Sequence, residues 1–127
     1  MYVKNNIAVI DSQDALIGNK AYDLASLVDD VRFKTSNKLK NKILNNYFKK
    51  LKKTEIKEFI NDFEILSVLR NLKIIGIFMR LALRDNKKKY TKMIPYAWEM
   101  INYRMRKNRE FNSLKLILKH NFPKFVK

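Results

Sequence analysis

The stretch VIDSQDALIGNKAYDLASLVDD, residues 9–30, decides the fold, because an apolar segment gives way there to helical periodicity. It holds five of the 12 acidic residues in a chain whose formal net charge is +16. The apolar run Ile7–Ile10 predicts a short buried β-strand that ends at Asp11. The following residues are apolar at spacings of three and four, which predicts an α-helix that begins at Asn19 or Lys20.

Helical periodicity continues through most of the remaining sequence. An apolar stripe runs from Leu39 to Leu51, and the further helices are expected at Thr54 (as N-cap) to about Leu83, at Thr91–Lys107 with Pro95 in the first turn, and at Phe111–His120. The sequence therefore predicts a mainly α fold, with one short N-terminal β-strand followed by about five helices.

Gly76 lies inside the apolar run IIGIFM of the longest predicted helix. Glycine in a helix interior costs about 1 kcal/mol relative to alanine, because its backbone loses more freedom on folding. We therefore expect a second backbone to pack closely against Gly76.

The basic composition has two explanations. A net charge of +16 favours an anionic partner, such as nucleic acid, anionic lipid or a phosphorylated substrate. The 21 lysines against seven arginines, together with abundant asparagine and isoleucine, are also expected from an AT-rich coding sequence. Charge alone does not decide between them.

Several kinds of site and location are excluded or disfavoured by composition. The chain has no cysteine, which excludes disulfides and thiolate metal sites. Residues 1–6 do not resemble a secretory signal, and no apolar run reaches the length of a bilayer span, so we expect a cytoplasmic protein without a membrane partner. With two glycines there is no glycine-rich phosphate loop, and the single His120 has no second ligand for zinc.

The aspartates of the first stretch are the remaining candidates for chemistry. An aspartate that directly follows an apolar strand, as Asp11 does, can hold a divalent cation, and oxygen ligands suit Mg²⁺. Asp14 lies three residues further on. Solvated or helix-capping aspartates are the alternative interpretation, and it applies equally to Asp23, Asp29 and Asp30.

Two segments resemble the aminoglycoside-phosphotransferase-like kinases, and most closely the bacterial branch that phosphorylates cell-wall amino sugars such as N-acetylmuramate and N-acetylglucosamine. Residues 9–32, VIDSQDALIGNKAYDLASLVDDVR, are similar to the pattern I-D-F-Q-D-A-x-x-G-P-x-A-Y-D-L-A-S-L of that branch. Residues 70–98, RNLKIIGIFMRLALRDNKKKYTKMIPYAW, resemble its segment R-x-L-x-x-x-G-I-F-x-R-L-x-x-R-D-x-K-x-x-Y, which is followed by Pro and Trp. The resemblance implies the helical C-terminal lobe of a kinase-like phosphotransferase.

The resemblance also implies roles for individual residues. Asp11 corresponds to the aspartate that coordinates the Mg²⁺ bridging the ATP phosphates. Asp14 is a candidate for the metal or substrate side, and Asp23 for a structural aspartate that ties the helix start to the catalytic centre. The candidates for the border of the sugar cleft are Arg80, Arg84 and Asp85. A buried or surface salt bridge is the alternative role for these last three.

Some family features differ or fall outside the match. Ser12 stands where an aromatic residue is usual, and Asn19 replaces the usual proline. The resemblance begins only a few residues after Met1, whereas the family's small lobe, its phosphate-anchoring lysine and its H-x-D-x-x-x-x-N catalytic loop precede this point. Residues 1–127 are thus expected to be a partial kinase-like C-lobe without the N-lobe and the catalytic loop.

Three functions remain open at this stage. The first is a truncated sugar or aminoglycoside phosphotransferase, inactive alone, that is either a decayed gene product or half of a split enzyme with a separately encoded N-terminal kinase half as partner. ATP and Mg²⁺ are implied here by the family resemblance only. The second is a basic helical nucleic-acid-binding protein that uses Lys38, Lys42, Lys49 and Lys53. The third is an independent kinase with a replacement base.

Overall fold

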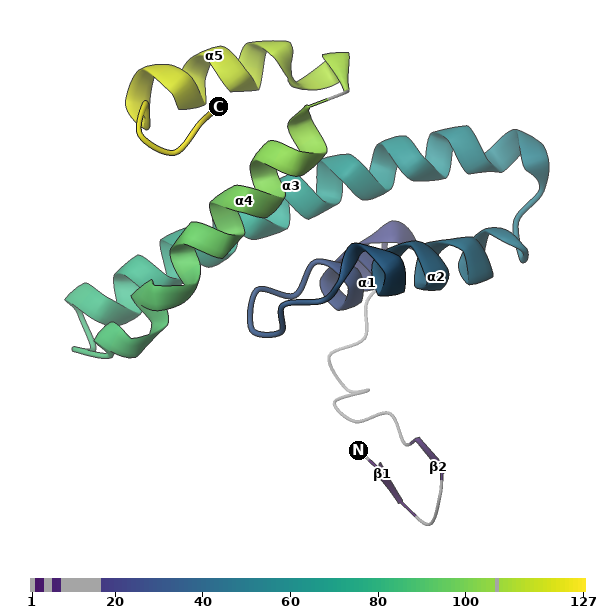
Figure 1. The fold of residues 1–127 in the computed structure, drawn as a ribbon, viewed down its shortest axis with the longest axis horizontal. Helices are drawn as coiled ribbons and strands as arrows, with labels where there is room; N and C mark the ends of the chain where they lie inside the picture. Colours follow the sequence, from purple (N-terminus) through teal and green to yellow (C-terminus); the bar gives the residue numbers. More distant parts are fainter. Residues whose placement is uncertain (1, 4–5, 8–16, 107) are drawn as a thin grey trace.

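The computed structural model describes residues 2–3, 6–7, 17–106 and 108–127, and this part of the chain is mainly helical (Figure 1). Its elements are α1 (Ala21–Val28), α2 (Asn37–Phe48), α3 (Lys53–Leu83), α4 (Ile94–Met105) and α5 (Asn112–Asn121), with two 3₁₀ turns, η2 (Lys88–Met93) and η3 (Arg109–Phe111). The predicted mainly α fold with about five helices is confirmed.

The N-terminal residues that the structure describes form two very short strands. Strand β1 (Tyr2–Val3) pairs antiparallel with β2 (Asn6–Ile7), so that Tyr2 lies opposite Ile7. The predicted strand Ile7–Ile10 is not supported by the structure, because residues 8–16 lie outside the described part and only Ile7 falls within it.

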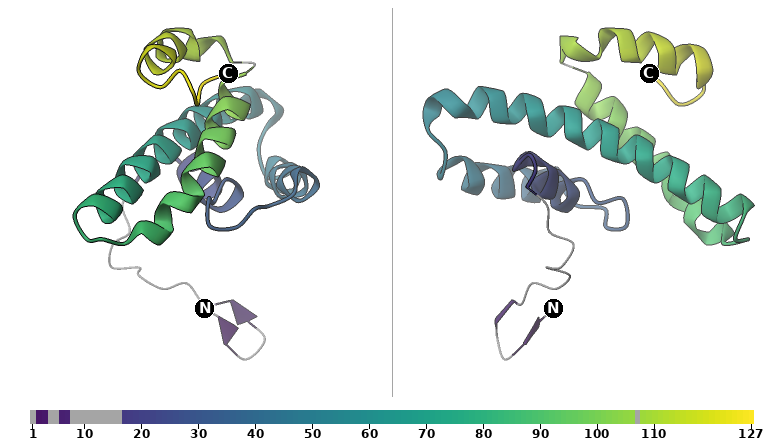
Figure 2. Two further views of the ribbon diagram at one scale, coloured as in Figure 1. Left: turned by 60° about the vertical axis from the view of Figure 1, so that its left-hand side comes forward. Right: turned by 180° about the vertical axis from the view of Figure 1, so that it is seen from behind.

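Helix α3 is the central element, and its 31 residues span about 46 Å at 1.5 Å per residue. Helices α1 and α2 lie against its N-terminal half, and α4 returns antiparallel along its C-terminal half (Figures 1 and 2). Helix α5 and the C-terminal tail lie at the end of the molecule where α4 ends.

Three apolar clusters hold these helices together, and α3 contributes to each of them. Phe59 and Phe63 pack against α1 and α2, Phe78 packs against Val31 and Ala97, and Val68 packs against α4, α5 and the tail. The apolar stripes of the helices thus meet as their spacing predicts. Leu27 and Leu39 are among the exceptions, because they are 63% and 49% exposed, while Lys40 beside Leu39 is only 3% exposed.

The N-terminal end of α3 differs from the prediction. Helix α3 begins at Lys53 after the N-cap Lys52, so Thr54 is not the N-cap. The Glu55 carboxylate accepts a hydrogen bond from the Lys52 backbone N–H at 2.9 Å, which satisfies one of the free donors of the first turn. At the other end, Asn86 has a φ of 53°, a left-handed conformation that asparagine tolerates better than most residues, and the chain reverses there.

The predicted helix Thr91–Lys107 is shorter than expected. Residues 88–93 form η2, and α4 begins at Ile94 with Pro95 in its first turn, as predicted. Proline fits there because the first helical N–H groups have no partner within the helix. Helix α4 ends at Met105.

The expectation that a backbone packs against Gly76 is wrong. Gly76 is exposed, and among the described residues nothing lies within 4 Å of the position that its Cβ would occupy. The glycine therefore weakens α3 without a compensating close contact in this part of the molecule.

We expect Gly76→Ala to stabilise the protein by about 1 kcal/mol, because alanine adopts the helical backbone at lower entropic cost and meets no neighbour. Urea unfolding followed by circular dichroism measures this change. Gly18→Ala, outside any helix and also without a neighbour within 4 Å, is the control with a smaller expected effect. A destabilised Gly76→Ala protein would show that the position needs glycine for another contact.

Candidate functional site

The predicted metal ligand Asp11 and its neighbour Asp14 lie outside the described residues. The structure does describe where their segment joins the helices. The Asn19 side chain accepts a hydrogen bond from the Ala21 N–H at 2.9 Å and donates one to the Asp62 carboxylate at 2.6 Å. Helix α1 begins at Ala21 with Lys20 as its N-cap, close to the predicted start at Asn19 or Lys20, and Asn19 attaches the end of the segment to α3.

A pocket of about 310 Å³ opens at this junction. It is lined by residues that follow the aspartate segment and by one face of α3 together with Leu51: Gly18, Asn19, Lys20, Leu51, Glu55, Glu58, Phe59 and Asp62. Three of these side chains are carboxylates and one is a cation. Two of the carboxylates are hydrogen-bonded within the protein, Glu55 to Lys52 and Asp62 to Asn19.

The described residues do not form a metal site by themselves. Among residues 17–106 and 108–127, no three histidine or carboxylate side chains lie close enough together to hold a metal ion. Asp11 and Asp14 stay predictions as Mg²⁺ ligands, since carboxylate oxygens are of the kind that Mg²⁺ prefers.

The other predicted site residues are spread over α1 and the far end of α3. Asp23 is exposed in the first turn of α1, where a negative charge is favourable near the helix N-terminus. Arg80 and Arg84 belong to the C-terminal end of α3. Arg84 lies about 33 Å along the helix axis from Asp62, so this group is not brought together with the pocket.

Arg84 and Asp85 form the salt bridge that the alternative interpretation predicts. The Arg84 guanidinium donates from Nε and Nη2 to the two Asp85 carboxylate oxygens at 2.7 and 3.1 Å. The hydrogen bond from Arg84 lowers the pKa of Asp85. A role at the border of a sugar cleft stays a prediction for all three residues.

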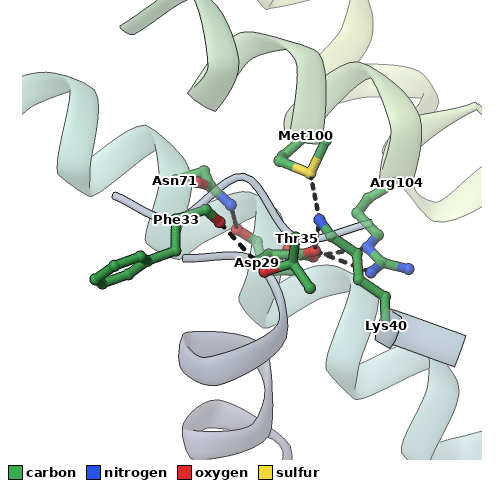
Figure 3. A network of polar contacts seen from close by, with 8 residues as sticks. Asp29, Phe33, Thr35, Lys40, Asn71, Met100 and Arg104 are labelled. Carbon is green, nitrogen blue, oxygen red and sulfur yellow. Dashed lines mark hydrogen bonds and ion pairs between the residues drawn. The ribbon is translucent and has the colours of Figure 1, made fainter. Parts of the chain in front are cut away.

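A buried ion cluster around Asp29 is the main polar feature of the described residues, and the sequence did not reveal it (Figure 3). Arg104 donates from Nε to Asp29 Oδ2 at 2.8 Å and from Nη2 to Oδ1 at 3.1 Å. Lys40 Nζ donates to Oδ1 at 2.9 Å and Ser67 Oγ to Oδ2 at 2.6 Å. Asp29, Lys40 and Arg104 are all buried, so this carboxylate is structural rather than solvated or capping.

Opposing effects set the protonation of Asp29. Burial raises the pKa of its carboxyl, but the hydrogen bond and charge of Arg104, with the hydrogen bonds from Ser67 and Lys40, outweigh burial and lower the pKa overall. The Asp29 carboxyl is therefore ionised at neutral pH. The cluster contains two cations and one anion, and the Phe63 ring lies 4.8 Å from the Arg104 guanidinium, where its face attracts the cation.

A signal for the cluster was present in the helical spacing. Lys40 precedes the apolar residues Ile43, Leu44 and Tyr47 at spacings of three and four, and Arg104 follows Ile101 by three. A charged residue in the buried phase of a helix needs a buried partner, because an isolated charge is costly to desolvate. The partner itself could not be named, since Asp29 is 75 residues from Arg104.

The relatives of this chain among curated proteins are kinases. Three of them are named N-acetylmuramate/N-acetylglucosamine kinase: the proteins of Neisseria meningitidis serogroup B (34% identical over 120 residues), Caulobacter vibrioides (32% over 92 residues) and Pseudomonas aeruginosa (34% over 101 residues). These matches cover 90%, 72% and 75% of this chain but only 35%, 25% and 30% of the relatives. The chain thus spans about a third of the length of the kinases to which it is similar.

The remaining comparisons add no family or fold. No family model matches the sequence, and no solved structure matches it. The similarity therefore supports the amino-sugar kinase part of the predicted resemblance, while the wider aminoglycoside-phosphotransferase-like assignment stays a prediction.

We expect Asp29→Asn to destabilise the protein by about 3–5 kcal/mol, because it leaves Lys40 and Arg104 buried without their counter-charge. Urea unfolding of the purified chain measures the loss. The exposed Asp23→Asn is the matched control, with an expected change below about 0.5 kcal/mol. Equal effects of the two substitutions would contradict a structural role for the buried cluster.

We expect the destabilisation by Asp29→Asn to depend on pH. The native pKa of Asp29 lies below its ordinary value of 3.8, so its charge contributes full stability above that value and loses this contribution as the pH falls through the lowered native pKa. The difference in unfolding free energy between the two proteins should thus shrink below about pH 4. Urea titrations at a series of pH values measure it. A difference that grows on acidification would contradict this sign.

Proposed function

We propose that residues 1–127 are the helical C-terminal part of an amino-sugar kinase of the N-acetylmuramate/N-acetylglucosamine type, and that they do not transfer phosphate by themselves. The observation that carries the proposal is 34% identity over 120 residues to the Neisseria kinase, with 90% of this chain aligned to only 35% of that relative.

In this proposal Asp11 would hold the Mg²⁺ that ATP-dependent phosphoryl transfer uses, and Asp14 is a candidate for the metal or substrate side. The carboxylates supply the hard oxygen ligands that Mg²⁺ needs. The hydrogen bonds of Asn19 to Ala21 and Asp62 attach residue 19, which follows the aspartate segment in the sequence, to α1 and α3. Phosphoryl transfer depends largely on positioning and charge stabilisation, for which a metal ion and its ligands are suited.

The rest of the catalytic machinery is proposed to come from a polypeptide region outside these 127 residues. The sequence contains no H-x-D-x-x-x-x-N segment, because its single histidine, His120, is followed by Asn and Phe. A region that supplies the small lobe and this loop would also stabilise the segment by binding to its native state. A decayed relative that no longer finds such a region is the alternative form of this proposal.

The experiment compares the chain alone with the chain co-expressed with the portion of the Neisseria kinase that it does not match. With ATP, Mg²⁺ and N-acetylmuramate or N-acetylglucosamine, we expect sugar phosphate only from the combined polypeptides. Asp11→Asn should lower the rate about a hundredfold or more, because the metal's charge stabilisation is lost. Thin-layer or mass-spectrometric detection of the sugar phosphate measures this.

Glu110→Gln, in the exposed turn η3, is the matched control that should leave the rate unchanged. Sugar phosphate produced by the chain alone would contradict the proposed inactivity. A complex that forms without any product would contradict a working Asp11, and the absence of any complex would leave only the decayed form.

A further inference from the structure

Helix α5 carries apolar side chains on two sides, one buried and one exposed. Phe111, just before the helix, and Leu118 are buried in the cluster with Trp98 and Val126. On the other side Leu116 is 72% exposed and Ile117 is 59% exposed. Helix α5 and the tail lie at one end of the molecule (Figures 1 and 2), and Leu116 and Ile117 are not members of the apolar cluster that α5 joins.

Cationic side chains lie next to Leu116, one of the two exposed apolar residues. Residues 109–127 contain five lysines and arginines against one carboxylate, Glu110. Three of the lysines and Leu116 line a pocket of about 340 Å³ between α5 and the tail, formed by Asn112, Lys115, Leu116, Lys119, Val126 and Lys127. No acidic side chain lines it. The salt bridges found among the described residues also use none of these three lysines.

The sequence of α5 and the tail explains this arrangement. The helix NSLKLILKHN needs only one apolar stripe, at Leu114 and Leu118, to pack on the core. Leu116 and Ile117 fall outside that stripe, so they are not buried against the core. The returning tail places Lys127 on the lining of the same pocket as Lys115 and Lys119, so three cationic side chains border one hollow that favours an anion.

We infer that this face, comprising Leu116, Ile117 and the lysine-lined pocket, binds the surface of an anionic phospholipid bilayer. A lipid phosphate is the anion that the three lysines would bind, while Leu116 and Ile117 enter the boundary between headgroups and acyl chains. A helix that lies in the interface needs both features, an apolar side and flanking cations. Nucleic acid would use the lysines but would leave the two aliphatic side chains in water.

Binding of this kind differs from spanning a membrane. The sequence predicts no membrane partner because it lacks a long apolar run, and no helix among the described residues is long and apolar enough to cross a bilayer. A helix that lies in the membrane interface is recognised by having one apolar face and one charged face, and not by its length. The inference is independent of the proposed kinase function, since it uses none of the predicted site residues.

The test is co-sedimentation of the purified 127-residue chain with vesicles of phosphatidylcholine containing phosphatidylglycerol, and with vesicles of phosphatidylcholine alone. We expect binding to the anionic vesicles only, and weaker binding at high salt. Leu116→Glu should weaken it about tenfold or more, because a charge replaces a buried aliphatic side chain. The double variant Lys115→Gln with Lys119→Gln should also weaken it about tenfold or more.

The matched control is Leu39→Glu. Leu39 is also exposed on an amphipathic helix and lies beside Lys38 and Lys42, so the substitution makes the same chemical change on a different basic face. We expect a change below about twofold. Circular dichroism of each variant checks that it is folded, which is expected because both leucines are exposed.

Three results would overturn the inference. The first is equal binding to the two kinds of vesicle, and the second is an equal effect of Leu116→Glu and Leu39→Glu. The third is absence of vesicle binding with salt-dependent binding of duplex DNA that Leu116→Glu leaves unchanged, which would identify the basic face as a nucleic-acid surface instead.

Discussion

The carboxylate of Asp29 is the interaction on which the arrangement of the four helices α1 to α4 depends. Asp29 directly follows α1, and its partners Lys40, Ser67 and Arg104 belong to α2, α3 and α4. Apolar packing tolerates small shifts between helices, whereas a buried carboxylate that loses a partner leaves a charge without compensation. The cluster therefore fixes the relative positions of four helices at one point, and the apolar clusters on either side then fill the remaining space.

Whether a structural feature could be predicted depends on whether its signal is local in the sequence or involves residues far apart in the chain. The helices were found because their signals are local: spacing of apolar residues, Asn19 at the start of α1 and Pro95 in the first turn of α4. The errors also have local causes, since Lys52 and Glu55 cap α3 without the threonine that usually does so. The Asp29 cluster was missed because its partners are 11, 38 and 75 residues away. Periodicity can mark a charged residue as buried, but it cannot say which distant residue neutralises it.

The candidate site also has one part that the sequence predicts and another part that only the structure reveals. The motif around Asp11 was recognised in the sequence because its residues occur at the spacing of the family pattern, and its role as a metal ligand stays a prediction. The structure adds the attachment of that segment through Asn19 to Asp62 and shows that Arg84 and Asp85 pair with each other at the distant end of α3. A sequence pattern could not distinguish a cleft border from a salt bridge for these two residues, since both use the same charged side chains.

The continuity of α3 has a consequence for motion in any larger enzyme that contains this segment. One uninterrupted helix supplies Phe63, Val68 and Phe78 to three different apolar clusters, so a bend in α3 would shift these clusters relative to one another. Kinases commonly close around their substrates by rotation of domains about a few hinge residues. A hinge inside α3 would interrupt its continuous backbone hydrogen bonds, so the unbroken helix disfavours bending between the three clusters.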